Sequence, residues 1–191
     1  MLVLLGALFS AGYTGHTTYM VDIVQKEHSV LRGKASAVAS ADMGTPKLKE
    51  IIARMSKALS LQDDGVAIAA PQIGVPLRIF VVSGKVLRKK RDGSPASDRV
   101  FINPEIMSMS KEKIWMEEGC LSVRWLYGEV PRFTKATVRA YNENGKRFTL
   151  IGGKLLGHIF QHEIDHLEGI LFTDKARNLH EINPAKLKNH E

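Results

Sequence analysis

The sequence predicts a single α+β domain, and three observations support this class. The chain has 191 residues, of which 44% are hydrophobic and 25% charged, the composition of an ordinary globular protein. Amphipathic helical patterns begin at Thr45 and at Lys154. Short apolar segments separated by turn residues lie between them, as is typical of strands. Helix, several strands and helix in this order indicate an α+β fold.

The first helix begins at Thr45-Pro46, because Thr caps helices and Pro is tolerated at the first helical position. Asp63-Asp64-Gly65 ends it. The apolar residues between these limits recur at helical spacing, with Lys and Arg among them: Leu48, Ile51, Ile52, Met55 and Leu59. We therefore expect one face of this helix to pack on the core.

The middle of the chain predicts strands and turns. The segment 66–74 is too broken by Pro71 and Gly74 to form a helix. The charged segment 85–98 is expected to be an exposed loop. Strands are predicted over residues 77–82, 100–102, 114–116 and 137–141, and a hairpin turn at 142–145 leads into a strand over 147–151, which Gly152-Gly153 breaks.

The last helix, residues 154–168 closed by Gly169, carries the clearest chemical signal, His162-Glu163-Ile164-Asp165-His166. Residues four apart share a helix face, so both imidazoles can reach one ion. Glu163 lies on an adjacent part of that surface, suited to contact a water molecule at the ion. The buried side of the helix is marked by Leu156, Ile159, Phe160, Ile164 and Leu167.

Two histidines leave a metal site incomplete, so a third ligand is needed. Phe172 occupies the position where an extended metalloprotease motif has its third histidine, which excludes that motif. Glu181 is one downstream candidate. Cys120 is the better one, because a thiolate binds iron, zinc and cobalt ions well.

The net charge and the cysteine content indicate the binding partners and the cellular compartment of the protein. The net charge of +7 favours polyanionic partners such as nucleic acid or the ribosome, although it also serves solubility. Cys120 is the only cysteine, so no intramolecular disulfide forms, and a lone thiol fits a reducing compartment. We expect a cytoplasmic protein without specific DNA binding.

The apolar start, Met1 to Phe9, is far shorter than the roughly 20 residues that span a bilayer. No Lys or Arg precedes Lys26, whereas a signal peptide usually opens with a basic region. We predict a leader or extension over residues 1–19, a single domain over 20–191 and no membrane span. An organellar or exported form stays open.

Three segments then resemble the signature motifs of peptide deformylase: residues 65–74, 118–123 and 161–169, in the family's order and spacing. The resemblance covers about Val21 to Lys175. It implies an α+β fold in which antiparallel strands pack around the helix with the HExxH motif. It also implies hydrolysis of the N-formyl group from the initiator N-formylmethionine of nascent chains, with transient ribosome contact.

The resemblance further assigns roles to residues. Cys120, His162 and His166 hold one divalent ion, natively Fe²⁺, which Zn²⁺, Ni²⁺ or Co²⁺ can replace. Glu163 is the general base, and the Gln72 side chain and the Leu121 backbone N–H stabilise the oxyanion. The substrate contacts that it implies are Gly65, Val66, Ala67, Ile68, Tyr127, His158 and Ile159. Glu118 and Arg132 are expected to pair behind the cysteine.

The sequence also departs from the family pattern. Ala67 stands where a second glycine is usual, Arg124 where many members have Pro, and Tyr127 where many have Arg. Two alternatives therefore stay open. One is a related amidase that accepts another acyl group, and the other is an inactive peptide-binding or ribosome-binding homologue.

Overall fold

The computed structural model describes residues 22–87, 92–94 and 96–183, so the leader predicted over residues 1–19 lies outside the described residues. None of the described helices is long and apolar enough to cross a membrane. The elements follow one another along the chain as α1 (Pro46–Ser60), β1 (Ala67–Ala69), β2 (Ile79–Val82), β3 (Arg99–Met109), β4 (Lys113–Cys120), β5 (Val123–Phe133), β6 (Lys135–Tyr141), β7 (Arg147–Gly153), α2 (Lys154–Leu167) and β8 (Arg177–Glu181).

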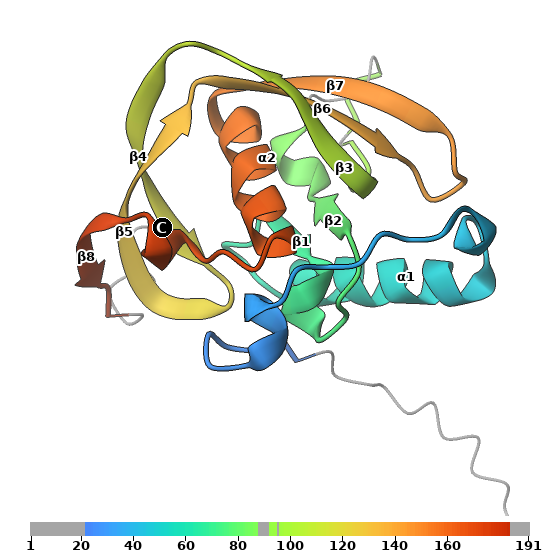
Figure 1. Ribbon diagram of the computed structural model, residues 1–191, viewed down its shortest axis with the longest axis horizontal. Helices are drawn as coiled ribbons and strands as arrows, with labels where there is room; N and C mark the ends of the chain where they lie inside the picture. Colours follow the sequence, from blue (N-terminus) through green and yellow to red (C-terminus); the bar gives the residue numbers. More distant parts are fainter. Residues whose placement is uncertain (1–21, 88–91, 95, 184–191) are drawn as a thin grey trace, which may run out of the picture.

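The strands form two antiparallel sheets. One has the order β1-β2-β3-β6-β7 and the other the order β4-β5-β8. Figure 1 shows α2 enclosed by the strands of both sheets, with α1 apart from it beyond β1 and β2. The predicted α+β class, with antiparallel strands around the second helix, is confirmed.

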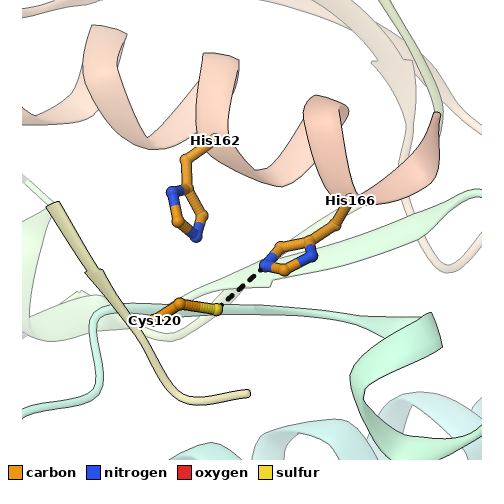
Figure 2. Close-up of side chains that lie close together, drawn as sticks. All are labelled: Cys120, His162 and His166. Carbon is orange, nitrogen blue, oxygen red and sulfur yellow. Dashed lines mark hydrogen bonds between the residues drawn. The ribbon is translucent and has the colours of Figure 1, made fainter. Parts of the chain in front are cut away.

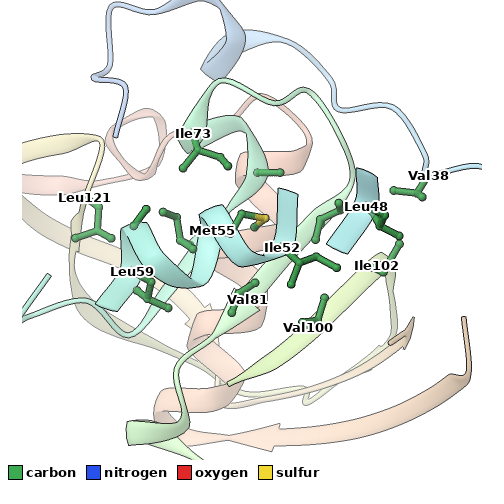
Figure 3. Close-up of a cluster of buried hydrophobic side chains, with 14 residues drawn as sticks. Val38, Leu48, Ile52, Met55, Leu59, Ile73, Val81, Val100, Ile102 and Leu121 are labelled. Atoms are coloured by element: carbon green, nitrogen blue, oxygen red, sulfur yellow. The ribbon is translucent and has the colours of Figure 1, made fainter. Parts of the chain in front are cut away.

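Helix α1 begins where the sequence predicts. The Thr45 hydroxyl accepts a hydrogen bond from the Leu48 backbone N–H, and Pro46 is the first helical residue. The apolar face of α1 packs on β1, β2 and β3 in a buried cluster (Figure 3). Leu48, Met55 and Leu59 are at most 2% exposed there, so this stripe anchors α1 to the sheet.

Strands β1 and β2 and the first part of β3 are buried on both faces because helices cover both. Successive side chains of a strand point to opposite faces. In β2, Ile79 and Val81 therefore face α1, whereas Phe80 and Val82 join the cluster under α2. The Phe80 and Phe101 rings stack at 4.4 Å between centroids, and the Phe160 ring of α2 meets Phe101 edge-on at 5.3 Å. These aromatic contacts fix α2 against the sheet.

Three strands, β1, β5 and β8, were not predicted from the sequence, and β3 and β4 are much longer than predicted. β3 and β4 extend well beyond 100–102 and 114–116, because their outer residues pair without being buried. β5 contains Gly128 and Pro131, which argue against a strand, but Pro131 lies past the last residue that pairs with β8. β8 is exposed along its length, so it has no hydrophobic pattern.

Gly152-Gly153 does not break the strand before α2, contrary to the prediction. β7 runs through both glycines, and α2 begins at the next residue. A Cβ atom on Gly152 would lie 2.8 Å from the Phe160 ring, and one on Gly157 would lie 2.7 Å from the Gly152 carbonyl oxygen. The glycines therefore allow the start of α2 to lie directly on β7.

We predict that Phe101→Ala lowers the free energy of unfolding by about 3–5 kcal/mol, because it removes a fully buried ring and leaves a cavity. Urea unfolding of the purified protein measures this loss. The control Leu61→Ala, at a side chain 54% exposed, should cost no more than about 0.5 kcal/mol. Equal losses in the two variants would contradict the packing described here.

Candidate metal centre

One cavity of about 280 Å³ lies between the two sheets and α2. Its lining comes mainly from the segment that enters β1, from the β4–β5 hairpin and from α2. Its outer residues include the exposed Trp125 and Leu155, whereas Gln72, Glu118 and Glu163 are at most 4% exposed. The cavity therefore leads from an open rim to buried polar side chains.

Cys120 and His162 line this cavity, and His166 lies beside them. One donor atom from each lies within 4.8 Å of the others. Cys120 ends β4, where the strand register shifts, and the two histidines lie one turn apart on α2. Figure 2 shows both rings directed from α2 toward the sulfur, with Cys120 Sγ 3.2 Å from His166 Nε2.

The charge state of Cys120 suits metal binding. Burial opposes the thiolate, but the His166 and His162 imidazoles outweigh burial and lower the pKa of the thiol to about 5. The thiolate is the form that coordinates metals, and imidazole nitrogens complement it for borderline ions such as Zn²⁺, Fe²⁺ and Co²⁺. The three donors therefore fit one divalent ion in position, burial and chemistry.

Glu118, buried beside the cysteine, receives hydrogen bonds from β5 and from α2. Arg132 donates to it through Nε at 2.5 Å and Nη2 at 3.0 Å, which confirms the predicted pair. His158 Nε2 and His162 Nδ1 each lie 2.7 Å from a carboxylate oxygen. Burial opposes ionisation, but the histidine and arginine contacts outweigh it and hold the pKa of Glu118 well below its usual range.

This carboxylate sets the orientation of His162. An ionised carboxylate only accepts hydrogen bonds, so His162 must donate its Nδ1–H to Glu118 Oε2. The other ring nitrogen, Nε2, is then left for the ion. Such carboxylate–histidine contacts hold metal ligands in position in many proteins.

Glu163 is a buried carboxyl group that directly follows His162 in the sequence, and it lines the cavity. Its Oε2 atom has no hydrogen-bond partner among the described residues. Burial raises the pKa of Glu163 to about 7. A buried carboxyl with an unpaired oxygen and a pKa near neutrality is suited to exchange a proton with a molecule in the cavity.

Gln72 is fixed at its carbonyl end. Its Oε1 accepts the Ala69 backbone N–H at 2.8 Å, and its Nε2 is 3.2 Å from Ser122 Oγ and 3.6 Å from Cys120 Sγ. The amide N–H₂ group is therefore directed toward the donor cluster. Leu121 follows Cys120 directly, and its side chain also lines the cavity.

The structure brings together most of the residues that the sequence marks as substrate contacts. The lining includes Gly65, Val66, Ala67, Tyr127, His158 and Ile159. Ile68 is a correction, because strand alternation turns its side chain away from the cavity and into the core beneath α1.

Sequence reasoning missed an ion pair at the rim of the cavity. Arg124, at the start of β5, bonds both carboxylate oxygens of Asp64 and the side chain of Gln62. Its guanidinium also lies 4.8 Å from the centre of the Trp125 ring. About 60 residues separate the partners, so no local pattern could reveal the pair.

The polypeptide deformylase family model matches residues 20–181 of this chain. The chain belongs to the polypeptide deformylase family. A peptide deformylase of Chloroflexus aurantiacus is 44% identical over 139 residues, which are 69% of this chain and 73% of that protein. One of Desulforudis audaxviator is 37% identical over 83% of this chain and 94% of its own length.

Solved structures agree with this membership. A class I type b peptide deformylase of Acinetobacter baumannii aligns with a TM-score of 0.72 and 30% identity, over 81% of this chain and 97% of its own. A peptide deformylase of Legionella pneumophila aligns with a TM-score of 0.70 and 36% identity, over 86% and 87% of the two chains.

We expect Arg132→Met to lower the free energy of unfolding of the metal-free protein by about 3–5 kcal/mol, because Glu118 would lose its buried cation. The matched control is Arg139→Met, which breaks the exposed pair with Glu105 and should cost less than about 1 kcal/mol. Chemical denaturation compares the two variants. Losses of similar size would refute the importance assigned to the buried pair.

Proposed function

We propose that this deformylase family member removes the N-formyl group from the initiator N-formylmethionine of nascent polypeptides, and that it requires one divalent metal ion. The observation that supports this most directly is the set of Cys120, His162 and His166 donors beside the unpaired Glu163 carboxyl oxygen. The products are formate and a peptide with a free amino group.

Cys120, His162 and His166 would hold the ion, which we propose to be Fe²⁺ natively, with Zn²⁺, Ni²⁺ or Co²⁺ able to replace it. When bound there, the ion supplies Lewis-acid chemistry that makes a water molecule more acidic and polarises the formyl carbonyl group.

Glu163 carries the proton through the reaction. Its carboxylate takes a proton from the attacking water, whose oxygen adds to the formyl carbon. The carboxylic acid then gives a proton to the amide nitrogen as the C–N bond breaks, and formate leaves. Burial raises the pKa of Glu163 in the metal-free protein, and the positive charge of a bound ion would favour the carboxylate that accepts the proton.

Gln72 and Leu121 are proposed to stabilise the oxyanion that forms on the formyl oxygen. The Gln72 amide is fixed by its bond to the Ala69 backbone, so its N–H₂ group does not have to reorganise. The Leu121 backbone N–H would provide a second donor beside Cys120. Fixed donors of this kind are typically worth about 3–4 kcal/mol each in the transition state.

The rest of the cavity would bind the first side chain of the peptide. Gly65, Val66, Ala67 and Ile159 offer mainly apolar surface, and His158 and Tyr127 add polar groups. One solved relative, from Acinetobacter baumannii, is described with Met-Ala-Ser bound. This supports a substrate that begins with an apolar, unbranched residue.

The biological setting follows from this substrate. N-formylmethionyl chains are made by bacterial-type ribosomes, so we propose action in the cytoplasm with transient contact to the ribosome. The net charge of +7 is compatible with an anionic ribosomal surface.

Removal of metal should abolish hydrolysis of formyl-Met-Ala peptides, and added Co²⁺ or Ni²⁺ should restore it. The reason is that Cys120, His162 and His166 contribute only ligands and cannot activate water alone. Formate release by chelator-treated and reconstituted protein, with metal analysis of each sample, tests the proposal. Full activity in metal-free protein would exclude it.

Glu163→Gln should retain the metal but lower kcat by about 10²–10⁴-fold, because the three ligands remain while the proton acceptor is lost. Steady-state kinetics and metal content are measured on one preparation. Near-wild-type turnover at full metal content would remove Glu163 from the mechanism.

Formyl-Met peptides should exceed formyl-Ala peptides in kcat/KM by roughly tenfold or more, because burial of an unbranched apolar side chain contributes a few kcal/mol at most. Competition between the two peptides in one reaction measures the ratio. A ratio near one would argue against the cavity as the side-chain site, even if deformylation itself is observed.

A further inference from the structure

Glu118 accepts as many hydrogen bonds as an ionised carboxylate can accept. Oε1 receives Arg132 Nε at 2.5 Å and His158 Nε2 at 2.7 Å, whereas Oε2 receives Arg132 Nη2 at 3.0 Å and His162 Nδ1 at 2.7 Å. Two carboxylate oxygens offer about four acceptor sites in total. All four hydrogen bonds form in a single orientation of the carboxylate, so each of them helps to hold the orientation that the other three need.

His158, besides lining the cavity, donates to this carboxylate from α2. It lies one turn before His162 on the same face of α2, so the helix places two imidazoles on one carboxylate. Its side chain is 10% exposed and that of Glu118 is 1% exposed. In such an environment an unmade hydrogen bond is costly, since little water can replace the missing donor.

Loss of the His158 contact would affect His162 through the shared carboxylate. Oε1 would keep only Arg132, whose Nη1 is also engaged by Asp165 at 2.6 Å. The carboxylate could then rotate toward the remaining donors, which would loosen the bond from Oε2 to His162. The orientation of the His162 ring, and hence of its Nε2 atom, would be less tightly defined.

We infer that His158 is a positioning residue for the metal centre, which acts through Glu118 to orient His162 and so tighten metal binding. This inference rests on the metal site of the proposed function. If His158 only formed part of the cavity wall, its replacement would change substrate binding and leave metal affinity unchanged.

The test compares Co²⁺ affinity in full-length variants, measured by competition with a chelator of known affinity. His158→Leu, which keeps comparable bulk without a donor, should weaken Co²⁺ binding by about 10–100-fold. His158→Gln, whose amide can donate to Glu118, should stay within about threefold of wild type. Leu155→Ala, which alters the cavity wall away from Glu118, should leave Co²⁺ affinity unchanged.

A second arm tests whether His158 acts through Glu118. In a Glu118→Gln background, His158→Leu should cause little further loss of Co²⁺ affinity, because the shared carboxylate is already gone. Independent losses that multiply in the double variant would overturn the inference. So would a folded His158→Leu protein with wild-type affinity, or a folded His158→Gln protein as weak as His158→Leu.

The readout separates this inference from the proposed function. Circular dichroism identifies any variant that fails to fold, and the His158→Gln comparison then decides. If the wild-type protein binds Co²⁺ but releases no formate from formyl-Met peptides, the proposed activity fails while the affinity data still test His158.

Discussion

The buried Glu118 carboxylate is the constraint on which the rest of the site depends. It joins β4 to β5 through Arg132 and to α2 through His158 and His162. Burial of an unpaired carboxylate would cost several kcal/mol, so it is stable only when all these elements are in place. The same contacts that hold the second sheet against α2 therefore also orient His162, one of the three candidate metal donors.

The five-stranded sheet supplies the other half of this arrangement. Its strands β1, β2 and β3 are covered by α1 on one face and by α2 on the other. Phe101 and Phe160 fix the height of α2 above the sheet. This packing brings the HExxH residues to the end of β1, where Gln72 is bonded to the Ala69 backbone.

The site is thereby divided into a rigid interior and an open rim. Inside, Gln72, Glu118 and Glu163 are buried, and the polar atoms of Gln72 and Glu118 are hydrogen-bonded, so these two side chains are held in place. At the rim, the pair of Arg124 and Asp64 joins two walls across solvent, where an ion pair contributes little to stability. Departures from the family pattern, such as Arg124 and Tyr127, lie in this outer part.

The sequence by itself determined the two helices, the Thr45 cap of α1, the α+β class and the pair of histidines on one face of α2. It left Cys120 and Glu181 as candidates for the third donor. Helical spacing and caps are local, and the spacing of the two histidines already places them on one face. The partnership of Glu118 with Arg132 came from the family resemblance.

Only the tertiary structure decided what depends on pairing between distant segments. Strand β8 carries no hydrophobic pattern, and β5 pairs despite Gly128 and Pro131. The family resemblance placed Ile68 in the substrate cavity, whereas the alternation of side chains along β1 places it in the core. His158 likewise contacts a carboxylate about 40 residues away in sequence, because hydrogen bonding is decided by distance in space.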